Sequence, residues 1–237
     1  MSLLTVVQDV CPVVGVIVPT SVFTNINANR TMQEMVACAN EMAQRIGGDE
    51  RDWTKLTKTA TFTGDGVASA FNLPADYKRM LKNGNVWLST TPMQPMQFID
   101  DADQWMQRRT QGYSNAWGEW MIEAGQMLIW PVMGVGVTAK FKYIDANPIA
   151  LTSGGNGDRF MADTDTFRLP ERLLKLGMTW QWKSQKGAQY AEDMSTYYDA
   201  LTRVEGSDKP APILIDRLPL SNYARVGASW PPGWGPP

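Results

Sequence analysis

The hydrophobic pattern along the chain is helical near its start, strand-like in the middle and helical again after residue 168. In the first segment apolar side chains recur at steps of three and four, which places them on one helical face. Pro12 lies inside this pattern, so we expect this helix to kink or to end early, near Gly15. Its apolar stripe consists of Leu4, Val7, Cys11 and Val14.

A second helix is predicted after a loop over residues 16–29 that is rich in asparagine and contains a proline. Thr31 and Glu34 have the spacing of a capping box, in which each side chain bonds the backbone N–H of the other residue. The helix is expected to stop at Gly47 and Gly48. Its apolar stripe consists of Met35, Ala39, Met42 and Ile46.

Residues 169–201 predict two consecutive amphipathic helices. Pro170 suits a first helical turn, and Glu171 places a negative charge near the positive end of the helix dipole. Gly187 interrupts the pattern and separates the two helices. Taken alone, each stripe is typical of a helix that packs in a core. The stripes consist of Leu169, Leu173, Leu176 and Trp180, and then of Tyr190, Met194, Tyr197 and Leu201.

Residues 56–144 have the composition and spacing of short β-strands separated by turns. Residues 59–63 and 70–73 flank a glycine-rich turn, which predicts a hairpin. Residues 120–122 and 127–130 predict a second pair of strands. We therefore expect a small antiparallel β domain in the middle of the chain.

Three further elements are predicted within this middle region. Residues 135–143 alternate between apolar and polar side chains, as in a strand with one face in water. A short helix is expected over residues 101–110, with Asp100 or Asp101 as its cap. Short strands are expected at residues 86–88 and 96–99. The wet face of the alternating strand carries Gly136, Thr138, Lys140 and Lys142.

The order of these elements predicts an α+β fold, in which two N-terminal and two C-terminal helices form a bundle and the β domain is inserted between them. Residues 1–54 are the first half of the bundle, and residues 55–150 are the inserted β domain. Residues 151–205 hold a glycine-rich loop and the second half of the bundle, and residues 206–237 form an extended proline-rich arm.

The arm combines helix-breaking prolines with apolar side chains, so it is expected to be extended and to dock on another surface. The alternative is a tail that wraps back over its own domain. Its prolines are Pro210, Pro212, Pro219, Pro231, Pro232, Pro236 and Pro237. Its apolar residues are Ile213, Leu214, Ile215, Leu218, Leu220, Trp230 and Trp234.

The composition of the chain says little about its fold but excludes several kinds of chemistry. The 237 residues include no histidine, which removes the usual general base near neutral pH and the commonest transition-metal ligand. The formal net charge of −2 and the scattered basic residues do not suit a protein that grips DNA. Cys11 and Cys38 are expected to be free thiols, and the alternative, a disulfide between them, is disfavoured. No apolar run is long enough for a membrane span, and no secretory signal is recognised, so we expect synthesis in the cytoplasm.

Candidate catalytic and ligand-binding groups are few. Asp100, Asp101 and Asp103 cluster at the start of the short helix, where carboxylates more often cap the helix than bind a metal. The loop over residues 153–158 is glycine-rich but lacks the lysine and the preceding strand of a phosphate-binding loop. We expect no enzymatic activity, no cofactor and no metal.

The chain as a whole resembles the head-to-tail adaptor, or connector, proteins of tailed bacteriophages and gene transfer particles, over about residues 3–205. Three segments carry the resemblance: ACANEMAQRIGGDERDW at residues 37–53, FTGDGVASAFNLPADYKRM at residues 62–80, and FRLPERLLKLGMTWQWKSQKG at residues 167–187. The last of these is the most specific. The arm beyond residue 206 lies outside the comparison.

The resemblance implies a ring of subunits, a dodecamer, beneath the phage portal protein, made in the host bacterial cytoplasm and located in the neck of the virion. The ring would extend the DNA channel without specific DNA binding and offer a surface to a tail or neck protein such as a nozzle, stopper or terminator. The residues expected at the portal or subunit interface are Leu173, Leu176, Trp180, Tyr190, Met194, Tyr197, Ile213, Leu214, Ile215, Leu218, Trp230 and Trp234.

Two other functions remain open on sequence alone. A carbohydrate-binding or host-surface-binding tail module would use exposed tryptophans of the β domain, with Trp117 and Trp120 as the candidates. A phage-associated hydrolase would use the cluster of carboxylates at residues 100–103 with a metal ion.

Overall fold

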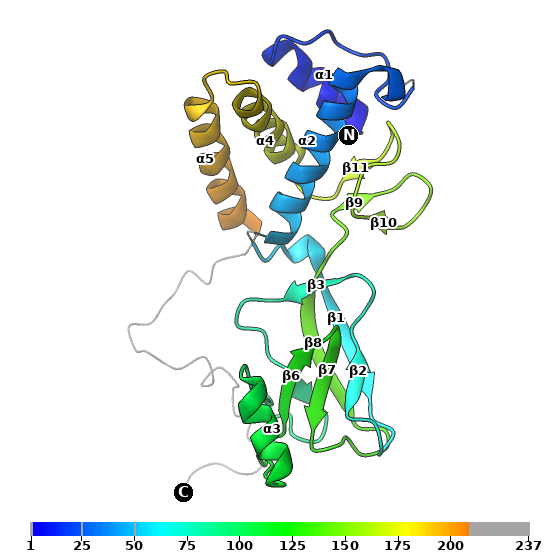
Figure 1. Cartoon of the computed structure of the whole chain (residues 1–237), viewed down its shortest axis with the longest axis vertical. Helices are drawn as coiled ribbons and strands as arrows, with labels where there is room; N and C mark the ends of the chain where they lie inside the picture. The colour runs from blue at the N-terminus through cyan, green and yellow to red at the C-terminus, as the bar shows by residue number, and fades with distance from the viewer. Residues whose placement is uncertain (1, 25, 50, 209–237) are drawn as a thin grey trace, which may run out of the picture.

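The computed structural model describes residues 2–24, 26–49 and 51–208, and these form an α+β structure in two parts (Figure 1). The helical part contains four α-helices and a small sheet, and the β part, residues 57–145, contains the remaining helix and the other sheets. The α-helices are α1 (Leu3–Val13), α2 (Arg30–Gln44), α3 (Ala102–Thr110), α4 (Glu171–Gln185) and α5 (Ala191–Asp208). Shorter helical turns are Ile26–Ala28, Arg45–Asp49 and Thr54–Leu56.

The strands are short and are distributed over three sheets. In the β part they are β1 (Thr57–Thr63), β2 (Ala70–Asn72), β3 (Tyr77–Met80), β4 (Trp87–Leu88), β5 (Gln97–Phe98), β6 (Glu119–Glu123), β7 (Gln126–Trp130) and β8 (Thr138–Asp145). In the helical part they are β9 (Ile149–Ala150), β10 (Asn156–Gly157) and β11 (Thr166–Phe167).

The helical part has one core built from both ends of the chain. Helix α4 contacts α1, α2 and α5, and buried side chains from all four helices belong to one cluster. Gly177 lets α2 approach α4 closely, because a Cβ atom there would lie 2.4 Å from Cε of Met42. The predicted apolar stripe is confirmed, since Met35, Ala39 and Met42 of α2 and Ile46 of the turn that follows it are all fully buried.

Helices α2 and α4 begin close to their predicted starts, but their caps differ from the prediction. Asn29, and not Thr31, caps α2, because its side-chain oxygen accepts a hydrogen bond from the backbone N–H of Met32. Glu34 instead binds Arg30 and a lysine that follows α4. Pro170 stands just before α4 as its N-cap residue.

Helix α5 continues three residues beyond the predicted boundary at residue 205. Asp208 explains this extension, since its carboxylate accepts hydrogen bonds from the backbone N–H and Oγ1 of Thr54, at 2.8 and 2.7 Å. Glu205 forms an ion pair with Arg51 one turn earlier. The end of α5 is therefore fastened to the segment that leads into the β part.

The β part holds two sheets that pack on each other. One has the order β1-β8-β3, with β4 also pairing with β8, and the other has the order β2-β7-β6-β5. The core between them contains Ala139 and Phe141 from the first sheet and Trp120, Met127 and Ile129 from the second. The predicted pair β6–β7 is confirmed as an antiparallel hairpin.

Two expectations about the β part are wrong. Residues 59–63 and 70–73 do not form a hairpin, because β1 pairs with β8 and β2 pairs with β7. The two strands meet only through side chains, with the rings of Phe62 and Phe71 stacked 5.2 Å apart. The β part is also not purely antiparallel, since β5 runs parallel to β6.

The alternating strand is confirmed from Ala139 onward. In β8 the side chains of Ala139, Phe141 and Tyr143 are buried, whereas Lys140 and Lys142 are exposed. The alternation fails at its predicted start, because residue 135 precedes the strand in a turn and its valine side chain is 82% exposed.

The small sheet β10-β9-β11 of the helical part is absent from the sequence prediction. Asp165 organises the loops around it, since its carboxylate accepts hydrogen bonds of 2.7 to 2.8 Å from the N–H groups of Thr152, Met161 and Ala162. Its carbonyl oxygen accepts a bond from the N–H of Leu3 in α1. Burial alone would raise the pKa of the Asp165 carboxyl, but the backbone donors lower it below its usual value.

Candidate interaction surfaces

Three of the residues predicted at the portal or subunit interface are buried inside the subunit. Leu173 and Tyr197 are fully buried, and Trp180 is 9% exposed. The rings of Trp180 and Tyr197 lie 6.1 Å apart, and the guanidinium of Arg45 lies 5.4 Å from the Trp180 ring. These side chains therefore pack α4 against α5 and α2, and any contact with another protein would have to be made by their neighbours.

The remaining predicted interface residues divide into two groups. Leu176 and Met194 are partly buried at the edge of the same core, and Tyr190, just before α5, is 39% exposed. Those of the arm lie outside the described residues: Ile213, Leu214, Ile215, Leu218, Trp230 and Trp234. The role of both groups at an interface stays a prediction.

The outer face of the β1-β8-β4 sheet carries basic and aromatic side chains together. Lys140 is paired with Thr61 on one side and with Trp87 on the other, and Lys142 is paired with Thr59. Side chains of paired residues stand on the same face of a sheet. We call these five residues the basic face.

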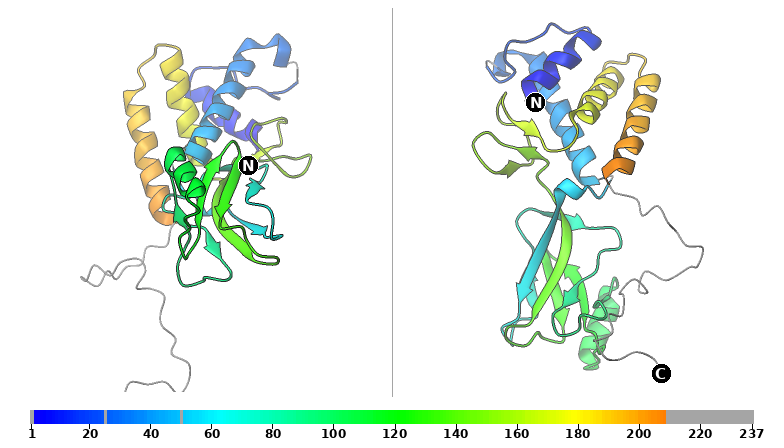
Figure 2. Two further views of the ribbon diagram at one scale, coloured as in Figure 1. Left: turned by 60° about the horizontal axis from the view of Figure 1, so that its bottom comes forward. Right: turned by 180° about the vertical axis from the view of Figure 1, so that it is seen from behind.

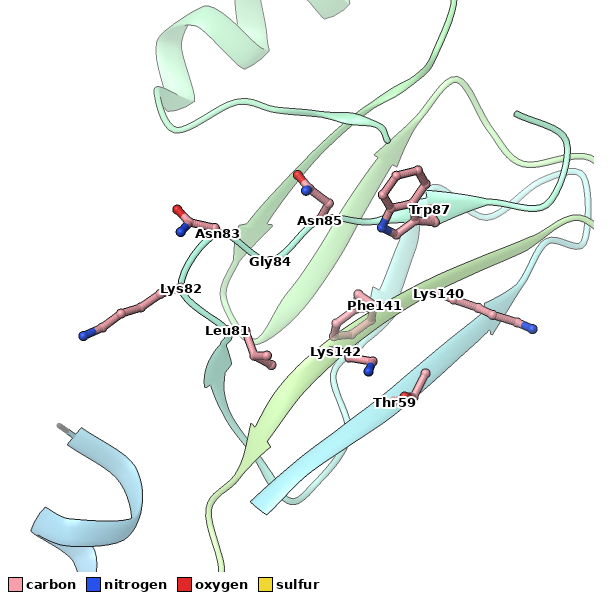
Figure 3. Close-up of a pocket in the computed structure, with 10 residues that line it drawn as sticks. All are labelled: Thr59, Leu81, Lys82, Asn83, Gly84, Asn85, Trp87, Lys140, Phe141 and Lys142. Atoms are coloured by element: carbon pink, nitrogen blue, oxygen red, sulfur yellow. The ribbon is translucent and has the colours of Figure 1, made fainter. Parts of the chain in front are cut away.

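A pocket of about 340 Å³ opens on the basic face, beside the loop that joins β3 to β4 (Figure 3). Lys82 and Lys140 extend outward from opposite ends of it, and Trp87 forms part of its wall. The Trp87 side chain is 37% exposed. The pocket is lined by Thr59, Leu81, Lys82, Asn83, Gly84, Asn85, Trp87, Lys140, Phe141 and Lys142.

Helix α3 covers the other sheet and is anchored by aromatic and charged contacts. Trp105 is buried against that sheet, and the guanidinium of Arg109 lies between the rings of Trp105 and Trp130, at 3.9 and 4.0 Å. Arg108 forms an ion pair with the buried carboxylate of Glu119. The helix is thereby fixed to the sheet, and its outer side faces solvent.

The carboxylates at the start of α3 remain on this outer side. Asp101, one of the two predicted candidates, is the N-cap, since it accepts a hydrogen bond from the backbone N–H of Asp103 at 2.8 Å. Asp100, Asp101 and Asp103 are exposed, and none has an ion-pair partner in the described part of the chain. Met106, one turn later, is 62% exposed. We call these four residues the acidic patch.

A charged cluster that the sequence did not predict joins the two parts of the molecule. The buried carboxylate of Asp145, at the end of β8, lies 2.6 Å from Arg168 and 2.9 Å from Lys58. Arg168 precedes α4 and also donates hydrogen bonds to the carbonyl oxygens of Lys55 and Asn147. The partners of Asp145 are far from it in sequence, so no local pattern indicates this cluster.

The structure separates the two tryptophans proposed for sugar binding. Trp117 is 37% exposed and lines a shallow pocket with Asn115, whereas Trp120 is only 5% exposed and packs in the core between the sheets. Trp120 cannot stack on a sugar in this conformation, so the assignment of Trp120 to sugar binding is wrong.

Residues 2–24, 26–49 and 51–208 contain no cluster of three or more cysteine, aspartate or glutamate side chains placed to hold a metal ion. No helix in this part of the chain has the length and hydropathy of a membrane span.

Comparison with known proteins identifies the family. Residues 1–213 match the family described as SU10 adaptor protein, and this match includes the helical part, the β part and the first residues of the predicted arm. No curated protein matches the chain. The match confirms the resemblance seen in the sequence, and it covers most of the 237 residues. The chain therefore belongs to the SU10 adaptor protein family, a family of phage head-to-tail adaptor proteins.

Proposed function

We propose that this adaptor forms a ring, a dodecamer, beneath the portal, extends the DNA channel and provides the surface to which the tail or a neck protein attaches. The observation that carries the proposal is the family match across both parts of the molecule. A head-to-tail adaptor must bind one assembly on the head side and another on the tail side. A molecule with two parts at opposite ends of its long axis suits this task (Figure 1).

The charge of the chain also supports a conduit. The formal net charge of −2 disfavours many strong phosphate contacts, and such contacts would hold the DNA that must slide through. In this proposal DNA passes without specific binding, and the protein catalyses no reaction. The protein would reside in the virion neck after synthesis in the host bacterial cytoplasm.

We further infer that α1, α2, α4 and α5 act as one bundle on the portal side, with the β part inserted between its halves. The shared core of these helices supports the view that they act as one unit. The apolar residues of the arm, together with the exposed edge around Tyr190, would supply the portal contacts.

The proposal is tested by mixing the full chain with purified portal rings of the same phage and imaging the complex by electron microscopy. A ring of subunits beneath the portal is expected, and the chain should be present in mature particles. A protein that neither binds portal rings nor occurs in particles would refute the proposal.

The arm is tested by deleting residues 209–237. The deletion should start at residue 209, because removal of Asp208 would break its bonds to Thr54. We expect weaker portal binding and an unchanged unfolding temperature. Unchanged portal binding would remove the arm from the mechanism.

A further inference from the structure

We propose that the basic face of one subunit binds the acidic patch of the next subunit, so that these two surfaces form the repeated contact of the ring. The inference rests on the proposed ring and names the surfaces that would close it. The contact is of the head-to-tail kind, in which each subunit offers two different surfaces.

The two surfaces lie on opposite sides of the β part because of the alternation of side chains along the strands. In β8, Lys140 and Lys142 point away from the core between the sheets, to which Phe141 contributes. In the second sheet, Met121 points away from the same core and packs under α3, beside Trp105. The order of layers is therefore basic face, first sheet, core, second sheet and α3.

The figures agree with this order of layers. Helix α3 lies toward the viewer in Figure 1, whereas β1 and β8 lie in front of it in the reverse view of Figure 2. In a closed ring of many copies, each subunit meets its two neighbours on nearly opposite sides. The positions of the basic face and the acidic patch therefore satisfy the geometry of such a ring.

The charges of the two surfaces are complementary and are not satisfied within the subunit. Lys140 and Lys142 have no ion-pair partner among the described residues. The three carboxylates of the acidic patch have none there either. Each surface also exposes an apolar side chain, Trp87 on one and Met106 on the other. Aromatic side chains and methionine are enriched at protein interfaces, and complementary charges speed the encounter and fix the register of two surfaces.

Rotational symmetry explains why the basic face would bind the acidic patch and not carboxylates of the helical part. A pure rotation moves each point at constant height along the ring axis. When the long axis of the molecule follows the channel, the β part of one subunit must therefore meet the β part of the next. At this level the chain offers an exposed cluster of three carboxylates, residues 100, 101 and 103, as the counterpart of the two lysines.

Duplex DNA is the other polyanion that this face could meet. The observations favour a second copy, because the complementary surface is present on the same chain and on its opposite side. Binding of the basic face to DNA is tested separately below.

The test is a charge exchange in the full chain. One variant carries Lys140→Glu and Lys142→Glu, and the other carries Asp100→Lys and Asp103→Lys. Asp101 is left in place, because it caps α3. Each variant alone should require about tenfold or more protein to form rings on portal, since like charges then face each other.

An equimolar mixture of the two variants should restore assembly, because an alternating ring pairs opposite charges at every contact. A single chain with all four substitutions should also assemble. Rescue of this kind cannot arise from a folding defect in either variant. Assembly of the lysine variant at the wild-type concentration, or failure of the mixture to recover, would overturn the proposal.

A second measurement separates this contact from portal attachment. The Lys140→Cys, Asp103→Cys variant of the free protein, concentrated under mild oxidation, should give a ladder of disulfide-linked chains. The native thiols should not interfere, because burial raises the pKa of both Cys11 and Cys38. A ladder without portal binding would retain the contact and reject the proposed attachment, whereas portal-bound rings without a ladder would reject the contact alone.

Retention on DNA decides the remaining alternative. The wild-type protein and the Lys140→Glu, Lys142→Glu variant should both pass through a DNA column at physiological salt. Strong retention of the wild type that this variant loses, together with normal ring assembly, would assign the basic face to DNA and refute the subunit contact.

Discussion

Replacing Asp145 with asparagine tests whether the charged cluster at the junction holds the two parts of the molecule together. The carboxylate is completely buried, whereas the side chains of Arg168 and Lys58 are 19% and 38% exposed. Asparagine has nearly the same shape and still accepts the hydrogen bond from the N–H of Asn147. The change therefore removes a charge without creating a cavity.

The expected loss of stability comes mainly from Arg168. Its charge-assisted bond to Asp145 is 2.6 Å long and mostly shielded from water, and its loss leaves a largely buried guanidinium without a counter-ion. We expect a loss of about 3 kcal/mol in the free energy of unfolding from this pair. Lys58 should add less than about 0.5 kcal/mol, because it is partly exposed and keeps its second partner Asp76.

The loss is measured by urea denaturation followed by tryptophan fluorescence, and it corresponds to a fall in melting temperature of about 6 to 12 °C. Asp158→Asn is the matched control, because that side chain is exposed and lies 3.7 Å from an exposed arginine. The control should change stability by less than about 0.5 kcal/mol. If Asp145→Asn loses under about 1 kcal/mol, the cluster does not fasten the two parts.

Three further predictions concern the helical part. Tyr197→Ala should destabilise the fold by about 3 to 5 kcal/mol in urea denaturation, because the ring is fully buried, whereas Tyr190→Ala should leave stability unchanged; equal effects would contradict the assigned packing. Gly177→Val should lower the melting temperature, since its side chain would collide with α2; an unchanged value would show that the helices can separate. The pKa of Asp165 is lowered in the folded protein, so its stabilisation is complete above about pH 4 and is lost as the pH falls through the lowered pKa. Asp165→Asn should therefore flatten the loss of stability below about pH 4, and an unaltered acid profile would refute this assignment.

Local sequence patterns were sufficient to predict most of the helices. Helical periodicity predicted α2, α4 and α5, and residue preference restricted the α3 cap to Asp100 or Asp101. The β6–β7 hairpin was predicted because its strands are close in sequence, and the structure joins them by a two-residue turn at Ala124 and Gly125. The family resemblance was also visible in the sequence, and the family match confirms it.

The candidate surfaces were only partly predictable. The sequence placed Lys140 and Lys142 on a wet strand face, but Trp87 joins them through strand pairing across 53 positions. The interface residues chosen from helical stripes proved to be mostly core, because the periodicity that marks one face of a helix does not say what covers it. The exposed residues around that core carry no periodic signal.

The sequence by itself determined where most helices form, which face of α2 is buried and the membership of the chain in its family. Only the tertiary structure decided that β1 pairs with β8 instead of β2, that Asp145 binds Arg168, and that the basic face and the acidic patch lie on opposite sides of the β part. Periodicity reports the local choice between buried and exposed positions. Strand pairing and charge pairing join residues distant in sequence, and their energies depend on geometry that exists only after the chain has folded.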